Sequence, residues 1–360
     1  MNSKVIRVLG IETSCDETAA AVVDSGRHIR SNVVASQVAV HKPYSGIVPE
    51  LASREHLRNI CYVVDRAFAD ARRKREDVDG IAVTQGPGLI GSLLVGLSFA
   101  KAMAFAMDKP LVPVNHIEGH IWSAFIEHPE ISYPVLALVV SGGHTSLIFS
   151  PAPGQYQPVG RTRDDAAGEA LDKLSKFLGL GYPGGPVIDR LSQRGDPRKF
   201  FFSVPKISDG SLDFSFSGFK TAALRHIEQA GIRRHQAGKR VGRQILDLVA
   251  SYQWAIAQTL VAQTRKAAKR LRPRSILLVG GVACNSLLRR TFREVFESGA
   301  SVGNVLSSEA SSAEETRVYF PSPALTTDNA AMIAAAGTPK LSAGGGLQLD
   351  LNAYADLRLC

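Results

Sequence analysis

Short apolar runs alternate with longer segments of helical periodicity along most of this chain. Strands are predicted at residues 80–84, 111–114, 134–140 and 276–279, where β-branched and aliphatic residues cluster between turn signals. Helices are predicted over residues 55–74, 89–107, 164–178 and 244–271, and a short alanine-rich helix over 330–336. This alternation is typical of an α/β fold.

One local layout, strand then small polar loop then strand, occurs twice. It is first seen as an apolar run at 5–11, a polar loop at 12–18 and a second run at 19–23. It returns as a run at 134–140, a glycine-containing loop at 141–145 and a run at 146–150. With 360 residues, the chain is long enough for two cores. The recurrence predicts two similar halves, each presenting a loop to a central cleft.

Composition narrows the class of protein. Lys and Arg number 42 against 33 Asp and Glu, a net charge of +9 that favours a polyanionic partner. The four cysteines lack disulfide or metal-ligand spacing, which indicates a reducing compartment such as the cytoplasm. The apolar run 89–107 contains Lys101, so it is interpreted as a buried core helix and no membrane association is expected.

The segment His116-Ile117-Glu118-Gly119-His120 carries the sharpest chemical signal. Two imidazoles four positions apart lie on one face of a helix and can share a transition metal. Zinc proteases with the same histidine spacing place their general base directly after the first histidine. Ile117 occupies that position here, so the pattern favours metal binding over that protease mechanism.

Several other segments have two interpretations. The polar loop 12–18 holds three carboxylates and suits a phosphate or a metal, or is a solvated hairpin tip. The glycine-rich turn 85–92 either lets backbone N–H groups approach an anion or allows a strand and a helix to pack closely. Asp328 by itself is interpreted as part of a helix N-cap. The Ser/Glu-rich stretch 298–315 is expected to form a polar surface loop.

Taken together, the motifs follow an order that resembles one family. From residue 5 to about 337 the chain contains, in sequence, ETSCDET, GPGLIGS, NHIEGH, VVSGGHT, GLGYPGGP, DFSFSGFKT, GGVACN and TDNAAMIA. This series closely resembles the bacterial tRNA N6-adenosine threonylcarbamoyltransferases, which make t6A and were formerly called glycoproteases. The resemblance implies an α/β, actin/Hsp70/sugar-kinase-like duplicated fold with two related domains around a nucleotide cleft. The domains are expected at 1–115 plus about 320–360, and at 116–319.

The resemblance also implies site residues. A divalent metal, Fe2+ foremost with Zn2+ as the alternative, would be held by His116, His120 and Asp328. The adenylate site would be lined by residues from four motifs: Val139, Val140, Ser141, Gly142, Gly143, Asp172, Gly185, Asp189 and Asn285. As a separate hypothesis that the resemblance does not itself supply, Asp16 or Glu17 orients or deprotonates the attacking amine. Cys284 replaces the usual alanine of the family, and the stretch 298–315 looks longer and more polar than its counterpart.

The implied reaction transfers threonylcarbamoyl from threonylcarbamoyl-adenylate to N6 of the adenosine beside the tRNA anticodon, with release of AMP. The implied partners are tRNA, a small paralogous subunit and an ATPase subunit. Two other functions remain open from the residues alone. One is a metalloprotease acting on glycoproteins, and the other is a small-molecule kinase or ATPase of the same fold.

Overall fold

The chain folds into two compact units in the computed structural model, which describes residues 5–204, 207, 209–236, 238–297 and 316–360. Unit 1 comprises Met1–Pro129 and Pro321–Leu359, and unit 2 comprises Glu130–Phe320. The polar stretch 298–315 lies outside the described residues. The expected domain boundary at residue 115 differs from the observed one because helix α4 (His116–Glu127) packs on the C-terminal helix α11 (Ala330–Ser342) of unit 1.

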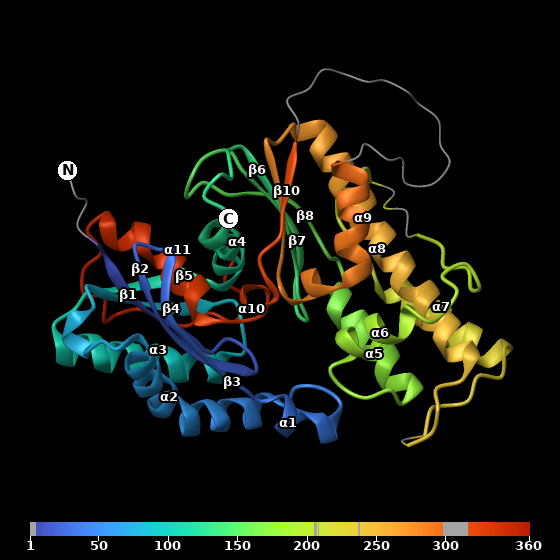
Figure 1. Ribbon diagram of the computed structural model, residues 1–360, viewed down its shortest axis with the longest axis horizontal. Helices are drawn as coiled ribbons and strands as arrows, with labels where there is room; N and C mark the ends of the chain where they lie inside the picture. The colour runs from blue at the N-terminus through green and yellow to red at the C-terminus, as the bar shows by residue number, and fades with distance from the viewer. Residues whose placement is uncertain (1–4, 205–206, 208, 237, 298–315) are drawn as a thin grey trace. The chain divides into compact units, whose positions relative to one another are not determined.

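Unit 1 is built on a five-stranded sheet with helices on both faces (Figure 1). The strand order is β3-β2-β1-β4-β5, with bounds Arg7–Glu12 (β1), Glu17–Asp24 (β2), His28–Ser36 (β3), Gly80–Gly86 (β4) and Leu111–Asn115 (β5). Alternate residues of β1 point to opposite faces, so Leu9 packs against α2 and α3 whereas Val8 packs against α11. The remaining helices are α1 (Val38–His41), α2 (Pro49–Ala71), α3 (Ile90–Met107) and α10 (Pro323–Thr326).

Unit 2 repeats this strand arrangement. Its sheet has the order β10-β9-β6-β7-β8, with bounds Val135–Val140 (β6), Thr145–Ser150 (β7), Gln157–Arg161 (β8), Ser275–Val279 (β9) and Arg317–Tyr319 (β10). The helices are α5 (Ala167–Leu178), α6 (Gly184–Ser192), α7 (Ser217–Gln229), α8 (Arg243–Leu271) and α9 (Ser286–Phe296). They bury one continuous core with alternate residues of β6, including Leu136 and Leu138.

The two sheets share one topology. In each, the first strand pairs antiparallel with the next strand of a meander and parallel with a strand that follows a helical crossover. A third antiparallel strand and a second parallel strand complete both sheets. This confirms the predicted duplicated α/β fold.

Some strands and one helix are not predicted by the pattern of apolar residues. The edge strands β3, β8 and β10 are not predicted because they are half-exposed or very short, so they lack a long apolar run. Helix α7 is also not predicted, because the aromatic and serine residues of 213–218 at its start are typical of a turn. Its start is held by Asp164, whose carboxylate accepts hydrogen bonds from Phe216 N and Ser217 N at 2.7 and 3.2 Å.

Helix α3 differs from the expected buried core helix. By length and composition, α3 and α8 are each long and apolar enough to cross a membrane. In α8, however, 83% of the most apolar 18-residue segment is buried inside unit 2. Only 33% of the corresponding α3 segment is buried, because just one side of the helix faces the sheet. The other side exposes Ile90, Leu94 and Phe105.

The buried carboxylate of Asp24 binds two arginines in the sheet of unit 1. Asp24 accepts hydrogen bonds from Nε of Arg7 and Nε of Arg30, both at 2.7 Å. Burial opposes ionisation, but these two bonds outweigh it and lower the pKa of Asp24 below 3.8. A lowered folded-state pKa stabilises the fold above the unfolded value, and this stabilisation disappears as the pH falls through the folded value.

Asp24→Asn should therefore lower the free energy of unfolding by about 2 kcal/mol at neutral pH. The difference from the parent should hold from about pH 8 to pH 5 and shrink below about pH 4, as measured by urea unfolding. A difference that grows on acidification would contradict this account.

Candidate metal centre

Helix α4 carries both predicted histidines at its first turns. It begins where the buried strand β5 ends, and Asn115 caps it by accepting hydrogen bonds from the backbone N–H groups of Ile117 and Glu118. This start places His116 and His120 one helical turn apart on the same side, with ring centroids 4.6 Å apart. The predicted helical spacing is therefore present.

Asp328 reaches the same place from the other end of the chain. It lies between α10 and α11, and the cap of α11 is its neighbour Asn329, whose side chain accepts from Met332 N at 3.1 Å. The side-chain cap of α11 thus belongs to Asn329, and the Asp328 carboxylate lies beside the two histidines. Two glycines permit the close packing of α11 that this requires. A Cβ on Gly10 would lie 2.2 Å from the Ala330 carbonyl oxygen, and one on Gly119 would lie 2.8 Å from Ile333 Cδ1.

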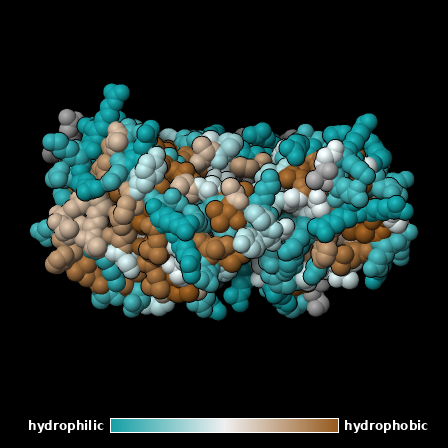
Figure 2. All heavy atoms as spheres, turned by 90° about the horizontal axis from the view of Figure 1, so that it is seen from below, coloured by the Kyte–Doolittle hydropathy of each residue, from teal (hydrophilic) through white to brown (hydrophobic). Residues whose placement is uncertain are grey.

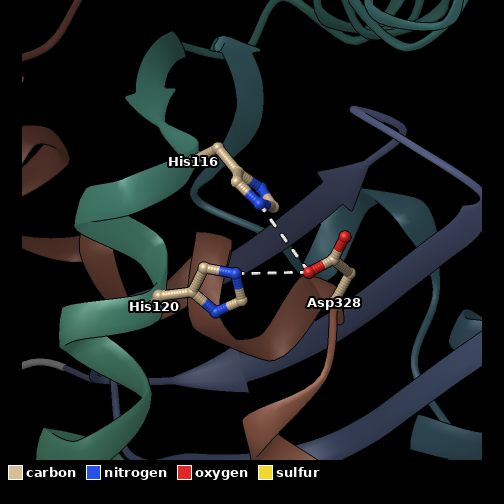
Figure 3. A group of neighbouring side chains, drawn as sticks. All are labelled: His116, His120 and Asp328. Atoms are coloured by element: carbon tan, nitrogen blue, oxygen red, sulfur yellow. Dashed lines mark ion pairs between the residues drawn. The ribbon is translucent and has the colours of Figure 1, made fainter. Parts of the chain in front are cut away.

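The three side chains converge on one point (Figure 3). Oδ1 of Asp328 lies 3.2 Å from Nε2 of His120 and 3.7 Å from Nε2 of His116. Both imidazoles are buried, whereas the Asp328 side chain keeps 17% of its surface exposed. One ligand atom from each residue lies within 4.8 Å of the other two. The site is thus closed on the protein side and open at the carboxylate.

This donor set fits a divalent transition metal. Neither ring nitrogen of His120 makes a hydrogen bond among the described residues, although Nε2 lies 3.2 Å from Asp328 Oδ1. Buried ring nitrogens without hydrogen bonds are costly unless a ligand satisfies them. Two imidazoles and one carboxylate are the ligands of catalytic zinc and of non-haem iron sites, which keep further positions open.

Electrostatics also favour a cation. Burial alone would lower the pKa of His116, yet the negative charges of Asp328 and Glu12 outweigh burial and raise it to about 9. Burial, reinforced by the neighbouring Asp16 and Asp328 carboxyls, raises the pKa of Glu17 to about 10. The predicted residue Glu17 therefore lies close enough to Asp16 and Asp328 to feel the charges of both. A bound cation would relieve this crowding of acids.

Glu12 was not predicted as a site residue. It ends strand β1 with no exposed surface, and its Oε2 lies 3.1 Å from Nδ1 of His116 and 2.6 Å from the Thr84 hydroxyl, which donates to it. Burial favours its neutral form, but the nearby His116 outweighs burial and lowers the pKa of Glu12. The available signal was a single carboxylate at the end of an otherwise apolar strand.

The predicted adenylate residues lie in unit 2 and gather where β6 and β9 end. Val139 and Val140 are the last residues of β6, and Val139 pairs with Val279 of the parallel strand β9. Ser141 closes a tight turn in which its hydroxyl accepts from His144 N at 3.1 Å. A Cβ on Gly142 or Gly143 would meet nothing within 4 Å, so the backbone of this loop is open to a ligand.

The other predicted residues of that set make structural bonds. Asp172 accepts from Gly184 N at 2.6 Å, next to the open Gly185, and so binds the start of α6. Asp189 accepts from the Ser286 hydroxyl at 2.9 Å and from the Gln253 amide at 3.1 Å. Asn285 caps α9 by accepting from Leu288 N. These residues shape the loops at the strand ends.

The Glu118 carboxylate is paired with Lys340 and is not one of the three predicted metal ligands. Its carboxylate accepts a hydrogen bond of 2.7 Å from Nζ of Lys340, which also donates to the Pro113 carbonyl. Glu118 is buried and ties α4 to α11. A protease general base must reach a metal-bound water, so this pairing agrees with the sequence argument against a zinc-protease mechanism.

Comparison with known proteins assigns the family. A family model for tRNA N6-adenosine threonylcarbamoyltransferase matches residues 28–335. The chain belongs to the tRNA N6-adenosine threonylcarbamoyltransferase family. A member from Syntrophotalea carbinolica is 49% identical over 97% of this chain and 96% of the relative. Another from Symbiobacterium thermophilum is 48% identical over 98% of this chain and 96% of the relative. The family predicted from the ordered motifs is thereby confirmed.

Solved structures support the fold alone. HypF in its phosphate- and nucleotide-bound form aligns with a TM-score of 0.59 at 11% identity, covering 96% of this chain and 57% of HypF. HypF of T.kodakarensis aligns with a TM-score of 0.57 at 16% identity, covering 94% of this chain and 48% of HypF. These matches agree with the duplicated fold expected for the transferase family.

Metal binding should be measurable by thermal unfolding. Zn2+, or Fe2+ under anaerobic conditions, should stabilise the protein by about 2.7 kcal/mol at a hundredfold excess over its dissociation constant. Asp328→Asn should abolish this gain, whereas the exposed Asp350→Asn should retain it. Because His116 holds a proton up to about pH 9, the metal must displace it, and affinity should rise with pH up to that value. Equal stabilisation of both variants would contradict the triad.

Proposed function

We propose that this protein transfers the threonylcarbamoyl group from threonylcarbamoyl-adenylate to N6 of the adenosine beside the anticodon of tRNA, with release of AMP. The observation that carries the proposal is the meeting of His116, His120 and Asp328 in a chain whose relatives bear this enzyme name along nearly their whole length. The comparison also speaks against the two rival functions, because the family model and the relatives are named as transferases and not as proteases or kinases.

The chemistry is an acyl-type transfer. The N6 amine of the adenosine forms a bond to the carbamoyl carbon, the bond from that carbon to the phosphate oxygen breaks, and AMP leaves with the electron pair. When bound at the triad, the metal, for which we propose Fe2+ with Zn2+ as alternative, supplies Lewis acidity to the threonylcarbamoyl group. His116, His120 and Asp328 would hold the metal in place.

Asp16 and Glu17 are the proposed residues for the amine proton. They follow β1 in the loop before β2, and the raised pKa of Glu17 means that it carries a proton at neutral pH in the metal-free protein. A protonated Glu17 can orient the substrate by donating a hydrogen bond, and the carboxylate of Asp16 can accept the proton that the amine loses. The reverse assignment applies if the bound cation deprotonates Glu17.

The loop Ser141–Gly143 is the proposed cradle for the AMP portion. Its open glycines leave backbone N–H groups accessible to a phosphate, and stabilisation of the leaving group's charge there would favour transfer. Asp172, Gly185, Asp189 and Asn285 are proposed to complete this site from α5, α6 and the start of α9. Val139 and Val140 are proposed to carry the loop at the end of β6.

Exposed basic residues are proposed to bind the tRNA backbone. Three arginines, Arg194, Arg240 and Arg243, line one cavity of about 430 Å³ at the start of α8. Guanidinium groups are suited to phosphate oxygens, and the net charge of +9 has the matching sign. Bases of an anticodon loop are already unstacked enough to enter a pocket.

The transfer should depend on the triad. Asp328→Ala should reduce t6A formation at least tenfold in an assay that supplies threonylcarbamoyl-adenylate, unmodified tRNA and the partner subunits, because one of three ligands is lost. The nucleoside product is quantified by mass spectrometry after digestion of the tRNA. Asp350→Ala, at an exposed position of the same unit, should retain the parent rate.

The same assay separates the rivals. Consumption of ATP with a sugar, in place of threonylcarbamoyl-adenylate with tRNA, would support a kinase. Cleavage of a glycoprotein that is lost in His116→Ala would support a protease. An unchanged t6A rate in Asp328→Ala would remove the metal triad from the mechanism.

We further propose that the small paralogous subunit binds the apolar outer face of α2 and α3, and that an ATPase subunit completes the assembly. Figure 2 shows apolar side chains gathered on the side that carries these helices in Figure 1. Leu57, Tyr62 and Phe105 each expose about two-thirds of their surface there (64%, 66% and 68%). Exposed apolar residues concentrated on adjacent helices are typical of a subunit interface. A paralogue of the same fold would offer equivalent helices.

Phe105→Glu should weaken binding of the paralogous subunit by at least tenfold, because it places a charge in the centre of an apolar contact. Isothermal titration calorimetry measures the change. Phe201→Glu is the matched control, since Phe201 is an exposed phenylalanine of unit 2 and should leave the affinity unchanged. Equal binding by both variants would exclude this face.

We place the enzyme in the cytoplasm, where its tRNA substrate is found. All four cysteines, Cys15, Cys61, Cys284 and Cys360, are free, which supports a reducing compartment.

A further inference from the structure

The Glu12 carboxylate is immobilised before it reaches His116. Its Oε1 accepts from the backbone N–H of Ser14, and its Oε2 accepts from the Thr84 hydroxyl at 2.6 Å. These partners come from the loop after β1 and from the neighbouring strand β4. With no exposed surface, the carboxylate cannot turn toward solvent. It is therefore a rigid acceptor with one remaining direction, toward the ring of His116.

The ring of His116 is oriented by that acceptor. Nδ1 lies 3.1 Å from Glu12 Oε2 and 3.1 Å from the Ser14 hydroxyl, while Nε2 on the other side of the ring faces Asp328. Glu12 Oε2 lies closer to Nδ1 than Asp328 Oδ1 lies to Nε2, at 3.1 against 3.7 Å. A cation held with Asp328 needs the lone pair of Nε2, so the hydrogen of the neutral ring belongs on Nδ1, where Glu12 accepts it. His120 has no hydrogen-bonded ring nitrogen among the described residues. The two histidines therefore differ, because His116 lies between Asp328 and the second carboxylate of Glu12, whereas the carboxylate beside His120 is that of Asp328.

Charge balance supports the same role. A divalent cation with two neutral imidazoles and Asp328 leaves one net positive charge in a buried site. Glu12 supplies the compensating negative charge from the other side of the His116 ring, where its Oε2 faces Nδ1. Burying an uncompensated charge is costly, so a neutral cluster is favoured.

We propose that Glu12 is a positioning residue of the metal centre, which holds His116 as the Nδ1–H tautomer so that Nε2 faces the cation. The inference rests on the metal triad of the proposed function and extends it beyond the three ligands. Carboxylate–histidine–metal arrangements raise the basicity of the ligand and fix its ring, and their loss typically weakens metal binding by about 10–100-fold.

The test compares metal affinity in the full-length protein. Glu12→Gln removes the charge, and its amide can donate to Nδ1 and thereby favour the wrong tautomer. The dissociation constant for Zn2+, measured by chelator competition, should rise by about 10–100-fold, and the visible absorption of bound Co2+ should change. Asp24→Asn is the matched control, because Asp24 is a buried carboxylate of the same sheet that is paired with Arg7 and Arg30 and has no contact with the triad. It should leave metal affinity unchanged within twofold.

The parent protein supplies a second measurement that needs no variant. Nitrogen-15 NMR of the zinc-loaded protein should show His116 protonated at Nδ1 and metal-bound through Nε2. Glu12→Asp, which keeps the charge but shortens the reach, should also weaken zinc binding by about tenfold. Metal bound through Nδ1 of His116, or parent-like affinity in a folded Glu12→Gln protein, would overturn the inference. Absence of zinc binding by the parent would instead overturn the triad itself.

Discussion

The close packing of helix α11 against strand β1 and helix α4 is the constraint on which the metal centre depends. Gly10 and Gly119 have no side chains at the two points of contact, where a Cβ would meet the Ala330 carbonyl oxygen or the side chain of Ile333. Because the helix can approach this closely, Asp328, two residues before its first residue, reaches His120 at 3.2 Å. A wider spacing would leave two histidines without their third ligand.

Burying the charged groups of the metal centre costs free energy, and a bound cation would offset that cost. Two imidazoles and the carboxyls of Glu12 and Asp328 share a volume from which water is largely excluded, and Glu17 lies close enough to feel the charge of Asp328. In the metal-free protein the strain appears as raised pKa values of His116 and Glu17. A divalent cation converts this crowded set into a near-neutral cluster, so the same charges that destabilise the empty site give it affinity.

The duplicated topology gives two equivalent loops with different chemistry. The loop between β1 and β2 carries Asp16 and Glu17, whereas the corresponding loop between β6 and β7 carries Gly142 and Gly143. The first suits a cation and proton transfer, and the second suits a phosphate. We interpret this as one ancestral strand–loop–strand unit that has acquired opposite electrostatic preferences in the two halves.

Periodicity and local motifs in the sequence determined the central strands, the long helices, the histidine pair on α4 and, through the order of eight motifs, the family. Those signals are local, because residues only a few positions apart are enough to identify a buried strand or the apolar face of a helix. Tertiary structure alone decided that Asn329 and not Asp328 caps α11, that Glu12 reaches His116 across 104 positions of sequence, and that α3 is exposed on one side. These outcomes depend on which distant segments pack together, and no spacing along the chain records that.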